Sequence, residues 1–192
     1  INDNITLITI NSQWYLEDWN KNPTINDDCN IKSREEFFAE FESLLNKNQD
    51  KTIVVAMHHP LFTNGVHGGH FGVRKMLLSA ENSFPVPLLG TLYNLLRKTS
   101  GISSQDVLNK DYTALSKRIQ TLIQKNENII VVSGHEHSLE YIEKNGVKQI
   151  VSGSGTKTNA ARAIYPNDFS YGKNGFATLE ILQTGEGILT FY

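Results

Sequence analysis

The chain has 192 residues, of which 39% are hydrophobic, so it is long enough to form one domain with a substantial core. Its 18 basic and 20 acidic residues give a formal net charge of −2, which argues against nucleic acid or an anionic membrane surface as a partner. The single cysteine excludes an internal disulfide framework, and no apolar run approaches the roughly 18 residues of a membrane span.

The first part of the chain alternates strand and helix signals. Ile5–Ile10 has the β-branched character of a strand, and the polar, aromatic-rich segment after it is expected to be a loop. Ser33 and Glu36 have the spacing of a capping box, which predicts the start of an amphipathic helix over Arg34–Asn46. Thr52–Met57 is a continuous apolar run, typical of a strand that is buried on both faces.

A long irregular segment follows over Pro60–Asn109, rich in glycine and interrupted by prolines. Its stretch VPLLGTLYNLLRK is apolar enough to pack, so we expect an ordered cap with a short helix over Leu89–Lys98. A second amphipathic helix is predicted over Asp111–Asn126, because its apolar residues recur on one face.

The last part of the chain changes to strands joined by tight turns. Ile129–Val132 is predicted to be a buried strand, and two hairpins follow it. Asn145 and Gly146 mark the turn of the first hairpin, and Gly185 and Gly187 lie in the turn of the second. The order strand, helix, strand, helix, strand, hairpin, hairpin predicts an α/β fold whose mixed sheet becomes antiparallel at its edge.

All six histidines follow two of the predicted strands. Four come after the strand that ends at Met57, and two come after the strand that ends at Val132, namely His58, His59, His67 and His70, then His135 and His137. Neighbouring parallel strands present their carboxyl ends at one edge of a sheet, where α/β proteins usually place their chemistry. We therefore expect the two clusters to form one site.

The second cluster, in the sequence GHEH, has the character of a metal site. If its backbone is extended, His135 and His137 point to the same side and can reach one metal centre. Gly134 permits the unusual backbone of a strand-to-loop corner, and neutral imidazole is a good ligand for zinc, iron, manganese or nickel. The spacing does not identify the metal.

The first cluster divides into two pairs. Pro60 forces His59 into an extended conformation, so we expect one of His58 and His59 to face the site and the other to face away. His67 and His70 lie on a glycine-flanked loop that can fold back over the site. Such histidines suit contact with a substrate, where they could hold a phosphate oxygen or protonate a leaving group.

The segments VVAMHHP and VVSGHEH, in this order and with a helix between them, resemble the last two conserved blocks of the calcineurin-like metallophosphoesterase superfamily, which includes purple acid phosphatases and many bacterial phosphoesterases. The resemblance implies the C-terminal half of a four-layer α/β/β/α sandwich with a mixed sheet. Residues 1–192 would then be one partial domain, with a cap-like insertion at about 64–111.

The resemblance also implies roles for the histidines. His58 and His135 would bind one metal ion, His137 would bind the other, and His67 would be the catalytic histidine that contacts the phosphate. With His70, His67 would form the substrate-binding pair. The cofactors would be two divalent or trivalent transition metal ions (Fe, Mn or Zn), which activate a bridging water for in-line attack on phosphorus in a phosphorylated substrate.

The chain departs from the family in its first blocks, because it contains no GD and no GN dipeptide. Those blocks would supply aspartate and asparagine ligands, and a two-metal site needs a bridging carboxylate to offset its charge. We therefore expect the missing N-terminal half of the domain, or a second chain, as a partner. The chain alone is expected to bind metal weakly and to show little or no turnover.

Two other readings stay open. The chain could be a non-catalytic phosphoesterase-like scaffold with at most one metal, or a mononuclear hydrolase that uses Asp27, Asp28 or Glu136 as a carboxylate ligand. The compartment is equally open, and the periplasm or cell envelope is compatible with the single cysteine in a longer protein. Both ends of the chain coincide with strand-like segments, as expected of cuts in something longer.

Overall fold

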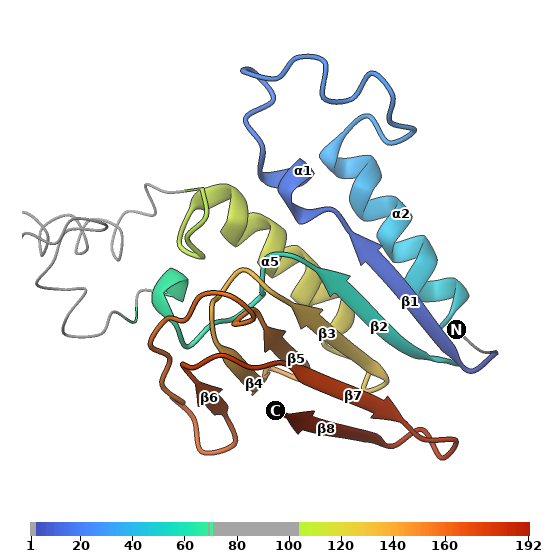
Figure 1. Ribbon diagram of the computed structural model, residues 1–192. Coiled ribbons are helices and arrows are strands. Elements are labelled where there is room, and N and C mark those ends of the chain that lie inside the picture. Colours follow the sequence, from blue (N-terminus) through green and yellow to red (C-terminus); the bar gives the residue numbers. More distant parts are fainter. Residues whose placement is uncertain (1–2, 69, 71–103) are drawn as a thin grey trace, which may run out of the picture.

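A computed structural model describes residues 3–68, 70 and 104–192, and these form a mixed α/β fold (Figure 1). A six-stranded sheet has the order β1-β2-β3-β5-β4-β6, and a separate pair of strands forms β7-β8. The strands are β1 (Ile5–Ile10), β2 (Thr52–Met57), β3 (Ile129–Ser133), β4 (Leu139–Lys144), β5 (Val147–Ser152), β6 (Phe169–Tyr171), β7 (Ala177–Ile181) and β8 (Gly187–Phe191).

Strands β1, β2, β3 and β5 run parallel, and β4 and β6 are antiparallel to their neighbours. The helices α2 (Arg34–Lys47) and α5 (Lys110–Ile123) lie in the connections that lead into β2 and β3. Met57, the last residue of β2, pairs with Ser133, the last residue of β3. The segments that carry the two histidine clusters therefore leave the sheet side by side, as expected.

The helices form a layer on one face of the sheet, and the β7–β8 hairpin lies on the other face (Figure 1). Alternate residues of β2 and β3 are buried, and Ile53, Val55 and Val131 are completely buried against the helix layer. Burial of each such side chain contributes about 1.5–3 kcal/mol, so this layer holds the strand ends in place. Among the described residues, no helix is both long and apolar enough to cross a membrane.

Local signals set the bounds of most elements. Ser33 caps α2 by accepting a hydrogen bond from the Glu36 amide at 3.1 Å, as the capping box predicts. In the β4–β5 hairpin, Asn145 and Gly146 both have positive φ, 53° and 76°. A Cβ at Gly146 would lie 2.6 Å from the Gln124 carbonyl oxygen, so this turn requires glycine for space as well as for conformation.

Two elements differ from expectation. The helix α1 (Ser12–Leu16) lies in the segment expected to be a loop, and the short strand β6 pairs with β4 at the sheet edge. Asn11 caps α1 by accepting a hydrogen bond from the Trp14 amide. The expected cap helix Leu89–Lys98, and most of the cap-like insertion at about 64–111, lie outside the described residues.

Candidate metal centre

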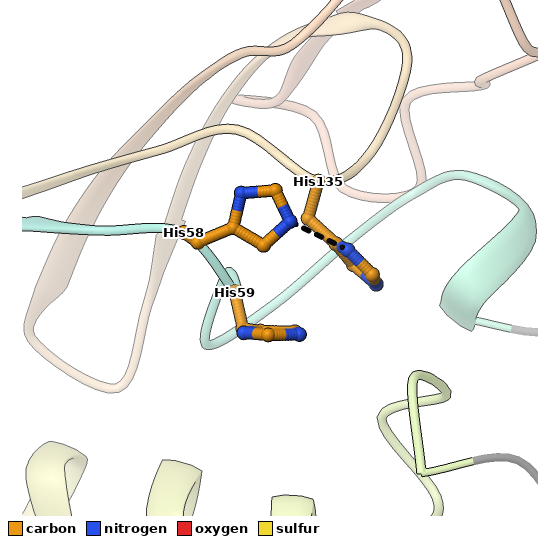
Figure 2. A group of neighbouring side chains, drawn as sticks. All are labelled: His58, His59 and His135. Carbon is orange, nitrogen blue, oxygen red and sulfur yellow. Dashed lines mark hydrogen bonds between the residues drawn. The ribbon is translucent and has the colours of Figure 1, made fainter. Parts of the chain in front are cut away.

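Three histidine rings meet where β2 and β3 end (Figure 2). His58 and His59 directly follow β2, and His135 follows β3 after one glycine. The Gly134 amide donates to the His58 carbonyl at 3.1 Å and so continues the pairing of the two strands past their ends. One nitrogen from each ring lies within 4.8 Å of the others, so the three could hold a metal ion.

His58 and His135 make the closest approach of the group, with 3.2 Å between His58 Nε2 and His135 Nδ1 (Figure 2). The other nitrogen of His135, Nε2, lies 2.9 Å from the Gln105 carbonyl oxygen, which can only accept a hydrogen bond. His135 Nε2 therefore carries the proton, and His135 Nδ1 accepts from His58 Nε2. The lone pair of His135 points at His58.

This separation fits two ligands of one metal ion. Two nitrogens bound to a tetrahedral zinc ion at about 2.0–2.1 Å lie about 3.3 Å apart, close to the 3.2 Å between His58 Nε2 and His135 Nδ1. Binding would require the His58 proton to move from Nε2 to Nδ1, and the lone pairs of both rings would have to turn from each other toward the ion. The pair fits one metal ion by distance and by ligand type.

His59 is held more firmly than its neighbours. It is completely buried, its Nδ1 lies 2.9 Å from Ser12 Oγ, and its Nε2 lies 3.0 Å from Gln105 Oε1. Its ring is 4.8 Å from that of His58 and 4.5 Å from that of His135. Both adjacent histidines belong to the group, so the expectation that one of them faces away from the site is wrong. The sequence did not predict that Ser12 of helix α1 would be the buried hydrogen-bond partner of His59.

The GHEH segment is not extended. His135 has φ of 61°, in the left-handed region that non-glycine residues rarely adopt, so the chain turns sharply at this residue. His137 is half-buried, and it does not belong to the three-histidine group. The expectation that His135 and His137 project to one side rested on an extended backbone, and that premise is wrong.

The loop after β2 brings His67 to the group, on the 3₁₀ turn Val66–Gly68. The His67 ring lies 4.2 Å from that of His135, and its Nδ1 lies 3.2 Å from the Asp106 carboxylate, which is 3% exposed. His70 is exposed, and its amide donates to the Gly65 carbonyl at 3.0 Å. Of the two loop histidines, His67 is the one whose ring is placed against that of His135.

Sequence reasoning missed three side chains that support the rings. Ser12 lies just past the end of β1, and this position at a strand end was its only signal. Gln105 and Asp106 lie near the end of a long irregular segment, and no pattern in the sequence distinguishes them. Each side chain contacts a histidine far away in the chain: Ser12 and Gln105 contact His59, and Asp106 contacts His67.

The surroundings keep the rings neutral. Burial lowers the pKa of His59 to about 4 and that of His135 to about 3, and the nearby His67 adds to both effects. Burial also lowers the pKa of His58. Because a metal ion binds the neutral imidazole, these shifts favour coordination at neutral pH.

Carboxylates do not join the histidine group among the residues that the structure describes. Asp27 and Asp28 are exposed, and Glu136 is completely buried with its carboxylate toward Thr63. The described residues therefore fit one metal ion held by histidines. They do not supply the carboxylate that a pair of metal ions requires.

We expect the free energy of unfolding of the metal-free protein to fall as the pH falls from about 6.5 to about 4. Over this range the unfolded chain protonates His59 and His135, whereas the folded chain keeps them neutral. Their stabilisation is therefore full above pH 6.5. Glu140 opposes this, because burial raises its pKa to about 7 and the folded chain holds its proton. His59 and His135 against this one carboxyl give a net slope of about 1.4 kcal/mol per pH unit, and His58, whose pKa burial also lowers, adds to it.

Urea unfolding at a series of pH values, with chelator present, measures this slope. In His59→Gln the slope should decrease, because this variant lacks one of the histidines whose pKa is lowered by burial. Stability that is unchanged or higher at pH 5 than at pH 7 would contradict the assignment of neutral rings.

No family model and no curated protein matches the sequence. Among solved structures the fold is similar to that of "GAP50 the anchor in the inner membrane complex of Plasmodium", with a TM-score of 0.57 and 16% sequence identity. The match covers 97% of this chain and 44% of that chain, so this chain spans less than half the length of its structural neighbour. At this identity the likeness concerns the fold alone.

Proposed function

We propose that the chain is the histidine-bearing part of a metal-dependent phosphoester hydrolase of the calcineurin-like metallophosphoesterase type. The observation that carries the proposal is the pairing of His58 Nε2 and His135 Nδ1 at 3.2 Å, at the ends of adjacent parallel strands, with the His67 ring beside them. This geometry combines a ligand pair with a third histidine on an approach loop. A closed structural metal site has no use for that third group.

In the proposed site, His58 and His135 hold one metal ion, and His137 is left to a second ion together with carboxylates from the rest of the domain. Bound transition metal ions supply a water of lowered pKa and polarise the phosphoryl oxygens. Asp106 accepts from the His67 Nδ1–H and so orients the ring. In the proposed mechanism His67 acts as the imidazolium, whose Nε2–H donates to the phosphoryl group and stabilises the charge that develops there.

The rest of the domain is the proposed partner. The β7–β8 hairpin lies opposite the helix layer, which supports a second sheet and hence the four-layer α/β/β/α sandwich (Figure 1). The groove between this hairpin and the main sheet has a volume of about 600 Å³ and is lined largely by apolar side chains such as Ile130 and Leu189. Strands of an N-terminal half would complete the second sheet and cover this groove.

The test is metal-dependent hydrolysis by the full-length protein that contains this chain. The substrates are 4-nitrophenyl phosphate and bis(4-nitrophenyl) phosphate, with Zn²⁺, Mn²⁺ or Fe²⁺ added. His67→Ala should lower kcat by about 10²-fold or more, the range for loss of a proton-transferring group, and Lys117→Ala, on the exposed face of α5, is the control. Equal kcat for His67→Ala and the control, or no metal-dependent hydrolysis of either substrate, would refute the proposal.

A second proposal is a non-catalytic scaffold that binds a partner and at most one metal ion. It is favoured by the lack of a carboxylate in the histidine group of the described residues. The structural neighbour is titled an anchor, which is a comparable role. Under this proposal the full-length protein would bind metal through His58 and His135 and would hydrolyse neither substrate.

A further inference from the structure

The segment from Thr63 to His67 lies directly against the turn that carries His135 and His137. Gly65 makes the contact possible, because a Cβ at this position would lie 2.6 Å from Cγ and 2.7 Å from Oε1 of Glu136. Real Cβ atoms do not approach other atoms so closely, so any larger residue at Gly65 must push Glu136 away. The loop and the turn are fitted to each other at this point.

The carboxylate of Glu136 binds this loop. Its Oε2 accepts the His67 backbone N–H at 2.9 Å and the Thr63 hydroxyl at 3.0 Å, and the side chain is completely buried. A buried carboxylate that accepts an amide forms a charge-assisted hydrogen bond, which is stronger than a neutral one. The other oxygen, Oε1, is buried without a hydrogen-bond partner among the described residues, so Oε2 alone makes the contacts of Glu136 to the loop.

A second buried acid, Glu140, also accepts a backbone N–H of this loop. Glu140, the second residue of β4, accepts the Asn64 N–H at 2.9 Å and the Ser138 hydroxyl at 2.7 Å. The loop therefore presents successive donors to two buried acids of the GHEH side. Glu136 holds Thr63 and His67, and Glu140 holds Asn64 between them.

His67 is thus held by its backbone as well as by its ring. Its N–H is bound by Glu136, its carbonyl accepts from the Val107 amide at 3.1 Å, and its Nδ1 pairs with Asp106. Glu136 lies between His135 and His137 in the chain, so the backbone of the loop histidine is fixed to the same turn as the strand-end histidine. The two cannot shift relative to each other without loss of the Glu136 contact.

We propose that Glu136 is a positioning residue for His67: its buried carboxylate holds the His67 backbone at the distance from His135 that substrate contact requires, and Gly65 provides the room for it. The inference rests on the proposed function, in which His67 contacts the phosphoryl group. It assigns a role to Glu136, the residue between the two histidines of GHEH.

The test uses the full-length protein loaded with metal, and compares Glu136→Ala with Glu136→Gln. The amide oxygen of glutamine can still accept from His67 and Thr63, whereas alanine leaves both donors unpaired. We expect Glu136→Ala to lower kcat by about 10- to 100-fold, the range for groups that orient a reacting residue, and Glu136→Gln to stay within about threefold. Metal content should be the same in both variants.

A double-mutant cycle with His67→Ala separates positioning from general damage. If Glu136 acts through His67, then Glu136→Ala should lower kcat no further in the His67→Ala background, within about twofold. An equal loss in both backgrounds, or loss of metal together with kcat, would overturn the proposal. Gly65→Ala repeats the test by displacing the carboxylate without removing it, and it replaces Glu136→Ala if that variant folds poorly. Gly155→Ala is its control, because no atom lies within 4 Å of a Cβ at Gly155.

Hydrogen exchange of the His67 amide decides the matter independently of turnover. This amide should be protected in the wild-type protein and in Glu136→Gln, and it should exchange at least tenfold faster in Glu136→Ala. If the wild-type protein hydrolyses neither substrate, the proposed function fails, and this readout alone decides whether Glu136 holds His67. Equal exchange in all three proteins would overturn the positioning role.

Discussion

Replacing His135 by alanine is expected to weaken zinc binding by on the order of 100-fold or more. His135 contacts both other members of the group and His67 as well: its Nδ1 meets His58 at 3.2 Å, and its ring lies beside His59 and His67. His59 cannot take its place as a ligand without giving up one of its hydrogen bonds, from Nδ1 to Ser12 or from Nε2 to Gln105. Elemental analysis after dialysis and titration calorimetry with Zn²⁺ measure the loss, on this 192-residue chain and on the full-length protein.

On the 192-residue chain His137→Ala is the matched control, because it removes a histidine from the same turn that lies outside the three-histidine group. With one metal ion per chain, bound by His58 and His135, His137→Ala should keep it. Loss of one ion from two in His137→Ala would instead place a second ion at His137, with carboxylates from outside the described residues. Zinc affinity unchanged in His135→Ala would contradict the assignment of the site.

The second large effect is expected from Gln149→Leu, which should lower the free energy of unfolding by about 3 kcal/mol or more. Gln149 lies on β5 and is completely buried. Its Oε1 accepts the amides of Leu61 and Phe62 at 2.6 and 3.2 Å, and its Nε2 donates to the Phe62 carbonyl at 2.6 Å. Leucine has a similar volume but leaves these backbone groups without partners, and each costs about 1–3 kcal/mol when buried.

Chemical denaturation followed by circular dichroism measures this change. Lys148→Leu, at the neighbouring position whose ammonium reaches the Glu127 carbonyl at 3.3 Å, is the control, and it should change stability by less than about 1 kcal/mol. Because Gln149 fixes the turn that follows His58 and His59, zinc affinity should fall with stability. A loss below about 1 kcal/mol for Gln149→Leu would show that these amides find other partners.

The sequence predicted the elements well wherever their signals are local. The strand bounds Ile5–Ile10 and Thr52–Met57 are confirmed, and the helix that begins after Ser33 is confirmed with an end one residue later than expected. The missed helix α1 is five residues long, too short to show a periodic apolar pattern, and its stability depends on a cap at Asn11 and on burial of Tyr15 and Leu16.

The site was predictable only in part, because its geometry depends on contacts between distant residues. That the two histidine clusters would meet could be predicted, because the strands that precede them are parallel and end at one edge of the sheet. The left-handed backbone at His135 did not follow, because glycine at position 134 was the expected residue for such a corner. Glu136 was one of the candidate carboxylate ligands, but its carboxylate accepts from Thr63 and His67, on a loop about 70 residues earlier, which no local pattern reveals.

Strand β1 has one partner, β2, among the described strands, and its other edge is open. The segment ITLITI contains no charge and no proline, is rich in β-branched residues, and exposes Leu7 to 46%. Uncharged segments of this kind are the usual templates for strand addition and fibrillar association. Colloidal stability of the protein at high concentration therefore depends on what covers β1, more than on any property of the histidine site.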